Sequence, residues 1–126
     1  MVADDSATIR RIVVSALHAL GYTDVVEAAD GKEALAKCDS SIELMVVDHW
    51  MPGISGAEVI RELRRRPTRL PIVLMSGLSA AELGVESAQP DAFLRKPFEL
   101  ADLAQTVREV ASTVNAPQEP AVPPIR

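Results

Sequence analysis

Short apolar runs alternate with longer stretches of mixed polarity along most of the chain. Four runs are apolar throughout and three or four residues long, namely Met1–Ala3, Leu44–Val47, Ile72–Met75 and Ala92–Leu94. A fifth short strand candidate, Val25–Ala28, contains one charged residue, Glu27. Runs of this length and composition, without a helical period, are typical of strands that are buried on both faces. We therefore predict five short strands.

The stretches between these runs carry the spacing of amphipathic helices. From Ile9 to Leu20 and from Leu100 to Val114, apolar residues recur every three or four positions, and Gly21 ends the first stretch. Three shorter stretches begin with a capping residue that is followed three positions later by glutamate: Asp30 with Glu33, Ser55 with Glu58, and Ser79 with Glu82. The pattern predicts five helices, and the fourth is the weakest because Gly84 interrupts it and Pro90 closes it early.

Strands and helices that alternate in this way predict an α/β fold. The alternation implies parallel strands joined by right-handed crossovers, in a doubly wound, three-layer sandwich with helices on both faces of the sheet. The 126 residues suffice for one such domain, which we assign to residues 1–114. Residues 115–126 are rich in proline and lack either period, so we expect a disordered tail or a linker there.

Polar side chains follow four of the five predicted strands. Asp4 and Asp5 come after the first strand, Asp48 after the third, Ser76 after the fourth and Lys96 after the fifth. The carboxyl ends of parallel strands meet at the edge where open α/β sheets bind ligands, so we expect these side chains to converge. Carboxylate oxygens suit Mg²⁺, and a lysine beside them suits a phosphoryl group.

These residues also carry a resemblance to a known family. The shared elements are the acidic pair Asp4-Asp5, Asp48 followed by Met51-Pro52 and Gly56, Ser76 after its strand, and Lys96-Pro97-Phe98. In this set and order the sequence resembles the receiver domains of two-component response regulators, from Met1 to about Val114. The resemblance implies a flavodoxin-like (βα)5 fold with the sheet order 2-1-3-4-5.

The resemblance also implies a role for each site residue. Asp48 would accept a phosphoryl group, since a carboxylate can attack phosphorus to give an acyl phosphate. Asp5 and Asp48 would bind Mg²⁺ directly, Asp4 would bind it through water, and the backbone carbonyl of Trp50 would complete the protein ligands. Lys96 and Ser76 would contact the phosphoryl oxygens. Phe93 would follow Ser76 as a switch, although a plain core phenylalanine is an equally good interpretation of that position.

The resemblance implies that the phosphoryl donor is a phosphohistidine on a sensor histidine kinase or a histidine phosphotransfer protein. We expect a signalling phosphoacceptor, rather than an enzyme, that assists its own phosphotransfer and dephosphorylation and passes the signal to an unknown protein target by contact. One alternative is a pseudo-receiver that docks a partner without phosphorylation. Another is a phosphatase with an aspartyl nucleophile, but this class needs a second acid where Trp50 stands.

The net charge bears on the class of partner, and the cysteine content bears on the cellular compartment. The chain has 13 basic and 18 acidic residues, a net charge of −5, whereas a general nucleic-acid binder needs a basic surface. We interpret the run Arg64–Arg66 as a solvated helix end, with a partner-docking patch as the alternative. Cys38 is the single cysteine and no apolar stretch is long enough for a membrane helix, so we expect a cytoplasmic protein.

Overall fold

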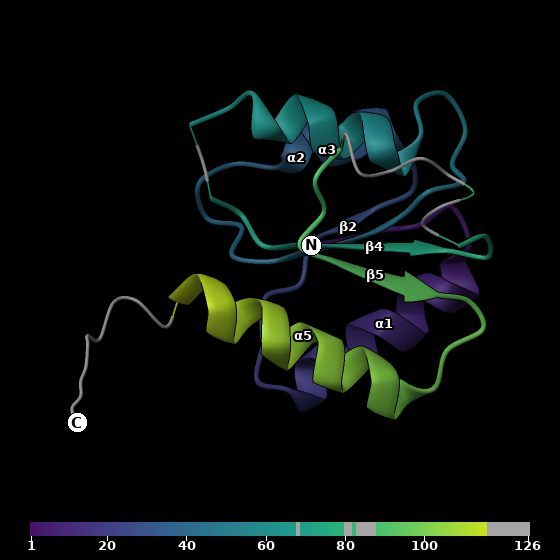
Figure 1. Cartoon of the computed structure of the whole chain (residues 1–126), viewed down its shortest axis with the longest axis vertical. Coiled ribbons are helices and arrows are strands. Elements are labelled where there is room, and N and C mark those ends of the chain that lie inside the picture. The colour runs from purple at the N-terminus through teal and green to yellow at the C-terminus, as the bar shows by residue number, and fades with distance from the viewer. Residues whose placement is uncertain (68, 80–81, 83–87, 116–126) are drawn as a thin grey trace.

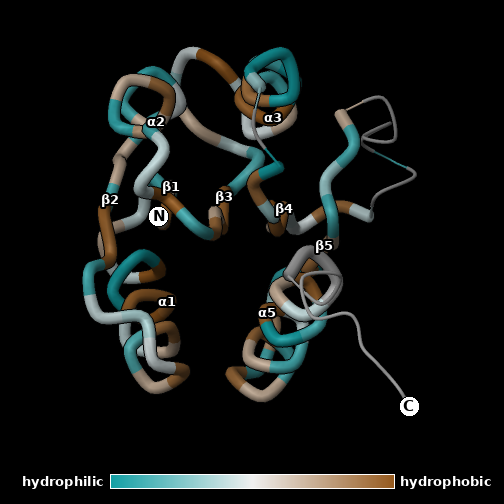
Figure 2. Tube along the Cα trace, turned by 90° about the vertical axis from the view of Figure 1, so that its left-hand side faces the viewer, coloured by the Kyte–Doolittle hydropathy of each residue, from teal (hydrophilic) through white to brown (hydrophobic). Residues whose placement is uncertain are grey.

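The computed structural model describes residues 1–67, 69–79, 82 and 88–115, and it contains one parallel sheet. The five strands lie in the order β2-β1-β3-β4-β5, as Figure 2 shows. Their bounds are β1 Val2–Ala3, β2 Glu27–Ala28, β3 Met45–Asp48, β4 Ile72–Ser76 and β5 Ala92–Arg95. The predicted α/β fold and the sheet order implied by the resemblance are both confirmed.

The helices cover the sheet from both sides, as predicted. Their bounds are α1 Ala7–Ala19, α2 Gly31–Lys37, α3 Gly56–Arg64 and α5 Leu100–Asn115. Figure 1 shows α2 and α3 on one face of the sheet and α1 and α5 on the other. Most of the predicted fourth helix and all of residues 116–126 lie outside the described residues, and α5 extends one residue past the predicted domain boundary.

The central strands are apolar throughout because both of their faces are covered. In β3, Met45 and Val47 pack into the core beneath α2 and α3, whereas Val46 packs into the core beneath α1 and α5. In β4 the residues alternate in the same way, and the whole strand is buried. A strand between two helical layers has no solvent face, so its sequence shows no alternation of polar and apolar residues.

The predicted helix starts are confirmed where the structure describes them. Ser55 and Glu58 form a complete capping box at the start of α3. At α2, Asp30 caps the helix as predicted, but Glu33 accepts a hydrogen bond from the backbone of Ala29 instead of that of Asp30. Ser79 and Glu82 also exchange both capping hydrogen bonds, at 2.8 and 3.2 Å.

The arginines at the end of α3 hold it to neighbouring elements. Arg64 forms an ion pair of 2.8 Å with Asp91, which directly precedes β5. Arg66 donates hydrogen bonds to two backbone carbonyls at the C-terminal end of α2, at 2.9 and 3.2 Å. Arg65 alone of the three is strongly exposed. The interpretation as a solvated helix end is therefore wrong for Arg64 and Arg66, whose guanidinium groups pair with groups on other elements.

Within the part of the chain that the structure describes, no helix is both long and apolar enough to cross a membrane.

Candidate functional site

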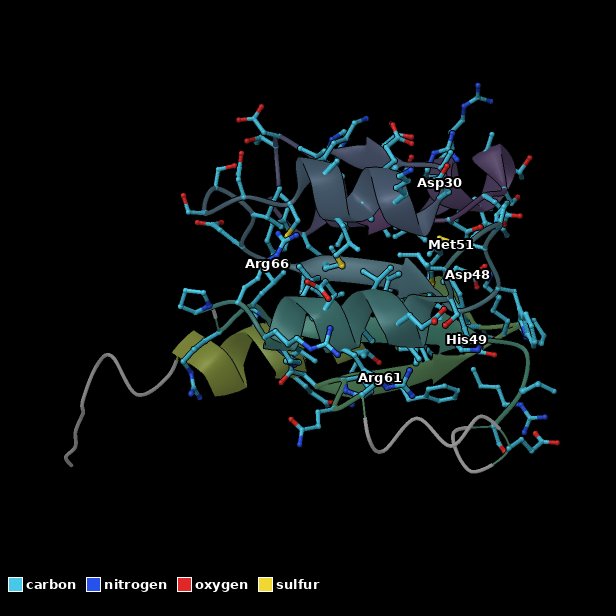
Figure 3. All side chains as sticks on the ribbon, turned by 90° about the horizontal axis from the view of Figure 1, so that it is seen from above. Asp30, Asp48, His49, Met51, Arg61 and Arg66 are labelled. Carbon is cyan, nitrogen blue, oxygen red and sulfur yellow. The ribbon has the colours of Figure 1, made fainter. Side chains whose placement is uncertain are left out.

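The fold brings the ends of β1, β3, β4 and β5 to one edge of the sheet. Asp4 directly follows β1, Asp48 is the last residue of β3, Ser76 is the last residue of β4 and Lys96 directly follows β5. Figure 3 shows Asp48, His49 and Met51 at this edge and Arg66 at the opposite end of α3. Since β1 and β3 are neighbours, their two acidic ends lie side by side.

Three carboxylates form the centre of the site. Asp4, Asp5 and Asp48 each offer one oxygen atom, and these atoms lie within 4.8 Å of one another. Asp4 and Asp48 are buried, while Asp5 is exposed. Asp4 is fixed because its Oδ1 accepts a hydrogen bond of 2.9 Å from the backbone amide of Ser6. A cluster of oxygen ligands without nitrogen or sulfur fits a hard divalent cation such as Mg²⁺.

Lys96 places one ammonium group between two of these carboxylates. Its Nζ lies 2.9 Å from Asp48 Oδ1 and 3.3 Å from Asp4 Oδ2. Burial on its own lowers the pKa of the ammonium, but the contacts with Asp48 and Asp4 outweigh burial and raise the pKa. Lys96 is therefore held in its charged form beside Asp48.

The charge of Asp48 is less well compensated than that of Lys96. Burial raises the pKa of its carboxyl above the ordinary value of 3.8, and the negative charges of Asp4 and Asp5 raise it further. The hydrogen bond and the charge of Lys96 lower the pKa, but they do not overcome burial. The Lys96 ammonium thus contacts two of the three clustered carboxylates, and a bound cation would relieve the repulsion among the three.

Ser76 and Phe93 lie on the two strands beyond Asp48. Ser76 is fully buried, and its Oγ accepts a hydrogen bond of 3.0 Å from the backbone amide of Leu78. The carbonyl oxygen of Ser76 accepts a hydrogen bond of 2.7 Å from the Lys96 amide, so the two residues are tied through the backbone. Phe93 is half-buried and packs against the core beneath α2 and α3.

The segment after β3 is packed closely against the strand end. The amide of Gly56 donates a hydrogen bond of 2.9 Å to the carbonyl of His49, and a Cβ at Gly56 would collide with the carbonyl oxygen of Asp48. Trp50 is 60% exposed, and its ring meets that of His49 edge to face at 5.1 Å. The two residues directly follow Asp48 in the chain, and the Trp50 side chain is turned toward solvent.

Comparison with known proteins now identifies the family. The family model described as "Response regulator receiver domain" matches residues 1–108. The chain belongs to this family. The receiver domain is 31% identical to the chemotaxis protein CheY of Pseudomonas aeruginosa over 120 residues, which cover 91% of this chain and 97% of that protein.

The receiver domain is also similar to a probable transcriptional regulator and to a second chemotaxis response regulator. It is 37% identical to the probable transcriptional regulator ycf27 of Porphyridium aerugineum, and the match covers 91% of this chain but 48% of that protein. The structure of the chemotaxis response regulator CheY4 of Vibrio cholerae has a TM-score of 0.79 and 31% identity, and the match covers 86% of this chain and 94% of that one. The chain is thus a phosphoacceptor signalling domain of the two-component type, whose members interact with histidine kinases or phosphotransfer proteins.

Sequence reasoning missed Arg10, which contacts the backbone of the acidic pair. A signal was present, because Arg10 precedes the fully buried residues Val13 and Leu17 by three and seven positions and so lies on the buried stripe of α1. A basic residue on such a stripe needs a partner, which here is the carbonyl of Asp4.

Proposed function

We propose that Asp48 accepts a phosphoryl group from a phosphohistidine on a sensor histidine kinase or a histidine phosphotransfer protein. The observation that carries the proposal is the placement of the Asp48 carboxylate, buried at the sheet edge between Lys96 and two further carboxylates. In the reaction a carboxylate oxygen of Asp48 forms a bond to phosphorus while the bond from phosphorus to the donor imidazole nitrogen breaks. The imidazole leaves and takes up a proton, and Asp48 becomes an acyl phosphate.

We assign the metal-binding roles to the acidic cluster. Asp5 and Asp48 would hold Mg²⁺ directly, Asp4 would hold it through water, and the backbone carbonyl of Trp50 would supply a further oxygen. The fully buried Asp4, held by Ser6 and Lys96, is the less free of the acidic pair, which supports its indirect role. When bound, Mg²⁺ supplies positive charge that offsets the negative charge of the phosphoryl oxygens.

Lys96, Ser76 and Phe93 complete the proposed site. Lys96 already contacts Asp48, and its ammonium is available to a phosphoryl oxygen once Asp48 is modified. The Ser76 hydroxyl is an uncharged donor that turns toward the phosphoryl group. Phe93 lies on β5 opposite Leu74, two positions before the partner of Ser76 in the neighbouring strand, and from there it would follow the movement of Ser76. The signal then passes by contact to a protein target, and the predicted cytoplasmic location stays a prediction.

Intact-mass measurement after incubation with a small-molecule phosphodonor tests the proposal. With Mg²⁺ we expect one base-labile phosphoryl group per chain, and with a chelator we expect almost none. Asp48→Asn should prevent the labelling because an amide is a far poorer nucleophile than a carboxylate. Asp24→Asn, at an exposed aspartate away from the sheet edge, makes the same chemical change and should label like the unmodified chain.

Two results would contradict the proposal in different ways. Full labelling of Asp48→Asn would show that another residue is the acceptor. Absence of labelling in the unmodified chain, with Mg²⁺ and with a phosphorylated histidine donor, would favour the pseudo-receiver alternative.

A further inference from the structure

The guanidinium group of Arg10 joins the acidic end of β1 to β2. Its Nη1 donates a hydrogen bond of 2.7 Å to the backbone carbonyl of Asp4. Its Nε donates a hydrogen bond of 2.9 Å to Oε1 of Glu27, with which it also forms an ion pair. The Arg10 side chain is 19% exposed, so this link is mostly shielded from solvent, whereas the Glu27 side chain is 46% exposed.

The carbonyl that Arg10 holds belongs to the peptide group between Asp4 and Asp5. A peptide group is planar, so fixing its oxygen also fixes the direction in which the chain enters Asp5. The side chain of Asp5 is exposed, so the position of its carboxylate depends on the direction of the backbone that carries it. Asp4 has further anchors in Ser6 and Lys96, so a change at Arg10 should displace Asp5 more than Asp4.

The carboxylate of Glu27 offsets the positive charge that Arg10 brings close to the proposed cation site. A guanidinium near a cation site repels the cation, and the effect is strong where the groups are partly buried. The carboxylate of Glu27, paired with Arg10 at 2.9 Å, offsets this charge. The carboxylate is the more exposed partner of this pair, so its negative charge offsets the charge of Arg10 without a second charge being fully buried.

We propose that Arg10 and Glu27 act as a positioning pair for the metal site, in which Arg10 orients the Asp4-Asp5 peptide group and Glu27 neutralises Arg10. This inference rests on the proposed Mg²⁺ site. Neither residue touches the metal or the phosphoryl group, so both act through the backbone and the charge of the acidic pair.

A Mg²⁺ titration followed by fluorescence tests the pair, because Trp50 is the single tryptophan and stands two residues after Asp48. Arg10→Gln should raise the Kd for Mg²⁺ about tenfold, which is typical when a group supporting a metal ligand is lost. Arg10→Lys retains the charge and a hydrogen-bond donor, so its Kd for Mg²⁺ should lie between that of the unmodified chain and that of Arg10→Gln. Arg11→Gln, at the exposed neighbouring arginine, is the matched control and should leave the Kd unchanged.

Glu27→Gln separates the electrostatic part from the geometric part. This change removes the carboxylate that pairs with Arg10 and leaves the weaker attraction of Glu33, so the Kd for Mg²⁺ should rise roughly threefold at low ionic strength, and the difference should shrink as salt screens the charge. The loss in Arg10→Gln should persist at high salt. Labelling rates at saturating Mg²⁺ should match those of the unmodified chain, which a general loss of structure would not allow.

Each outcome bears on a distinct claim. A Kd in Arg10→Gln equal to that of Arg11→Gln, or a tighter one, would overturn the positioning pair and leave the proposed function intact. If Arg10→Gln fails to fold by its thermal transition, an unchanged Kd in Arg10→Lys would overturn it instead. Absence of any Mg²⁺ binding in the unmodified chain would overturn the proposed metal site and, with it, this inference.

Discussion

At the scale of single residues, the site holds the carboxylate of Asp48 in a buried position, where its ionised form is destabilised. Asp48 is 4% exposed and has two other carboxylates within a few ångströms, with the Lys96 ammonium as a compensating partner. A buried carboxylate with such neighbours is destabilised in its ionised form, yet only this form can attack phosphorus. Ionised Asp48 therefore lowers the stability of the folded receiver domain.

This conflict predicts a pH-dependent gain of stability in Asp48→Asn. The pKa of Asp48 is raised in the folded state, so the folded protein holds this proton more tightly than the unfolded chain does. The resulting stability is present below the unfolded pKa and is lost as the pH rises through the folded pKa. Asp48→Asn lacks this loss, so without Mg²⁺ it should melt a few degrees above the unmodified chain at pH 7.

Thermal melts between pH 4 and pH 8 check the sign of this prediction. The advantage of Asp48→Asn should shrink toward the acidic end, where Asp48 itself becomes protonated. An advantage that grows as the pH falls would show that the Lys96 ion pair stabilises the fold more than burial of Asp48 destabilises it.

At the scale of elements, close packing between β3 and α3 sets the position of Asp48, the proposed acceptor. The first residue of α3 is Gly56, which lies directly against the last residue of β3, and His49 is joined to Gly56 by a backbone hydrogen bond. The capping box of Ser55 and Glu58 fixes where this helix begins. The strand end and the helix start therefore form one unit without space for an added methyl group.

We predict that Gly56→Ala destabilises the domain by about 2 to 3 kcal/mol, because the new methyl group meets backbone atoms of Asp48 and His49 that cannot move cheaply. Gly77→Ala is the control, since a Cβ at this position meets nothing within 4 Å and the backbone is not in the left-handed region. It should change the free energy of unfolding by about 0.5 kcal/mol at most. Equal urea midpoints for the two variants would contradict the packing account.

At the scale of the whole molecule, one sheet supplies both cores. Alternate residues of β3 and β4 enter the core beneath α2 and α3 and the core beneath α1 and α5, so neither helical layer can separate without exposing the strands. The proposed metal site joins the ends of two central strands, β1 and β3. A ligand at this place is therefore coupled to global unfolding, because the site exists only while the sheet is intact.

Addition of Mg²⁺ should consequently raise the melting temperature of the receiver domain. At a free concentration of about 100 times the Kd, binding to the folded state alone adds about 2.7 kcal/mol. Scanning calorimetry with Mg²⁺ and with a chelator measures the difference, and Asp5→Asn should lose most of it. A similar rise in Asp5→Asn would show that the cation acts elsewhere on the acidic surface.

The elements, and the polar residues that gather at one edge of the sheet, could be predicted from the sequence because their signals are local. An apolar run without alternation marks a strand covered on both faces, Ser55 and Glu58 mark a helix start, and polar residues at strand ends mark the ligand edge. The sheet order came from the family resemblance, since alternation alone is compatible with several orders.

Long-range contacts were beyond the sequence patterns because they depend on where distant segments meet. Arg64 contacts Asp91, and Arg66 contacts the end of α2; in each of these contacts the partners are 27 or more residues apart in the sequence. Likewise, Arg10 finds Glu27 only because β1 and β2 pair in parallel, and Lys96 finds Asp4 across 92 positions. The residue types of the proposed site can thus be recognised from short stretches of sequence. The charge balance around Asp48 depends on which distant residues the tertiary structure brings together.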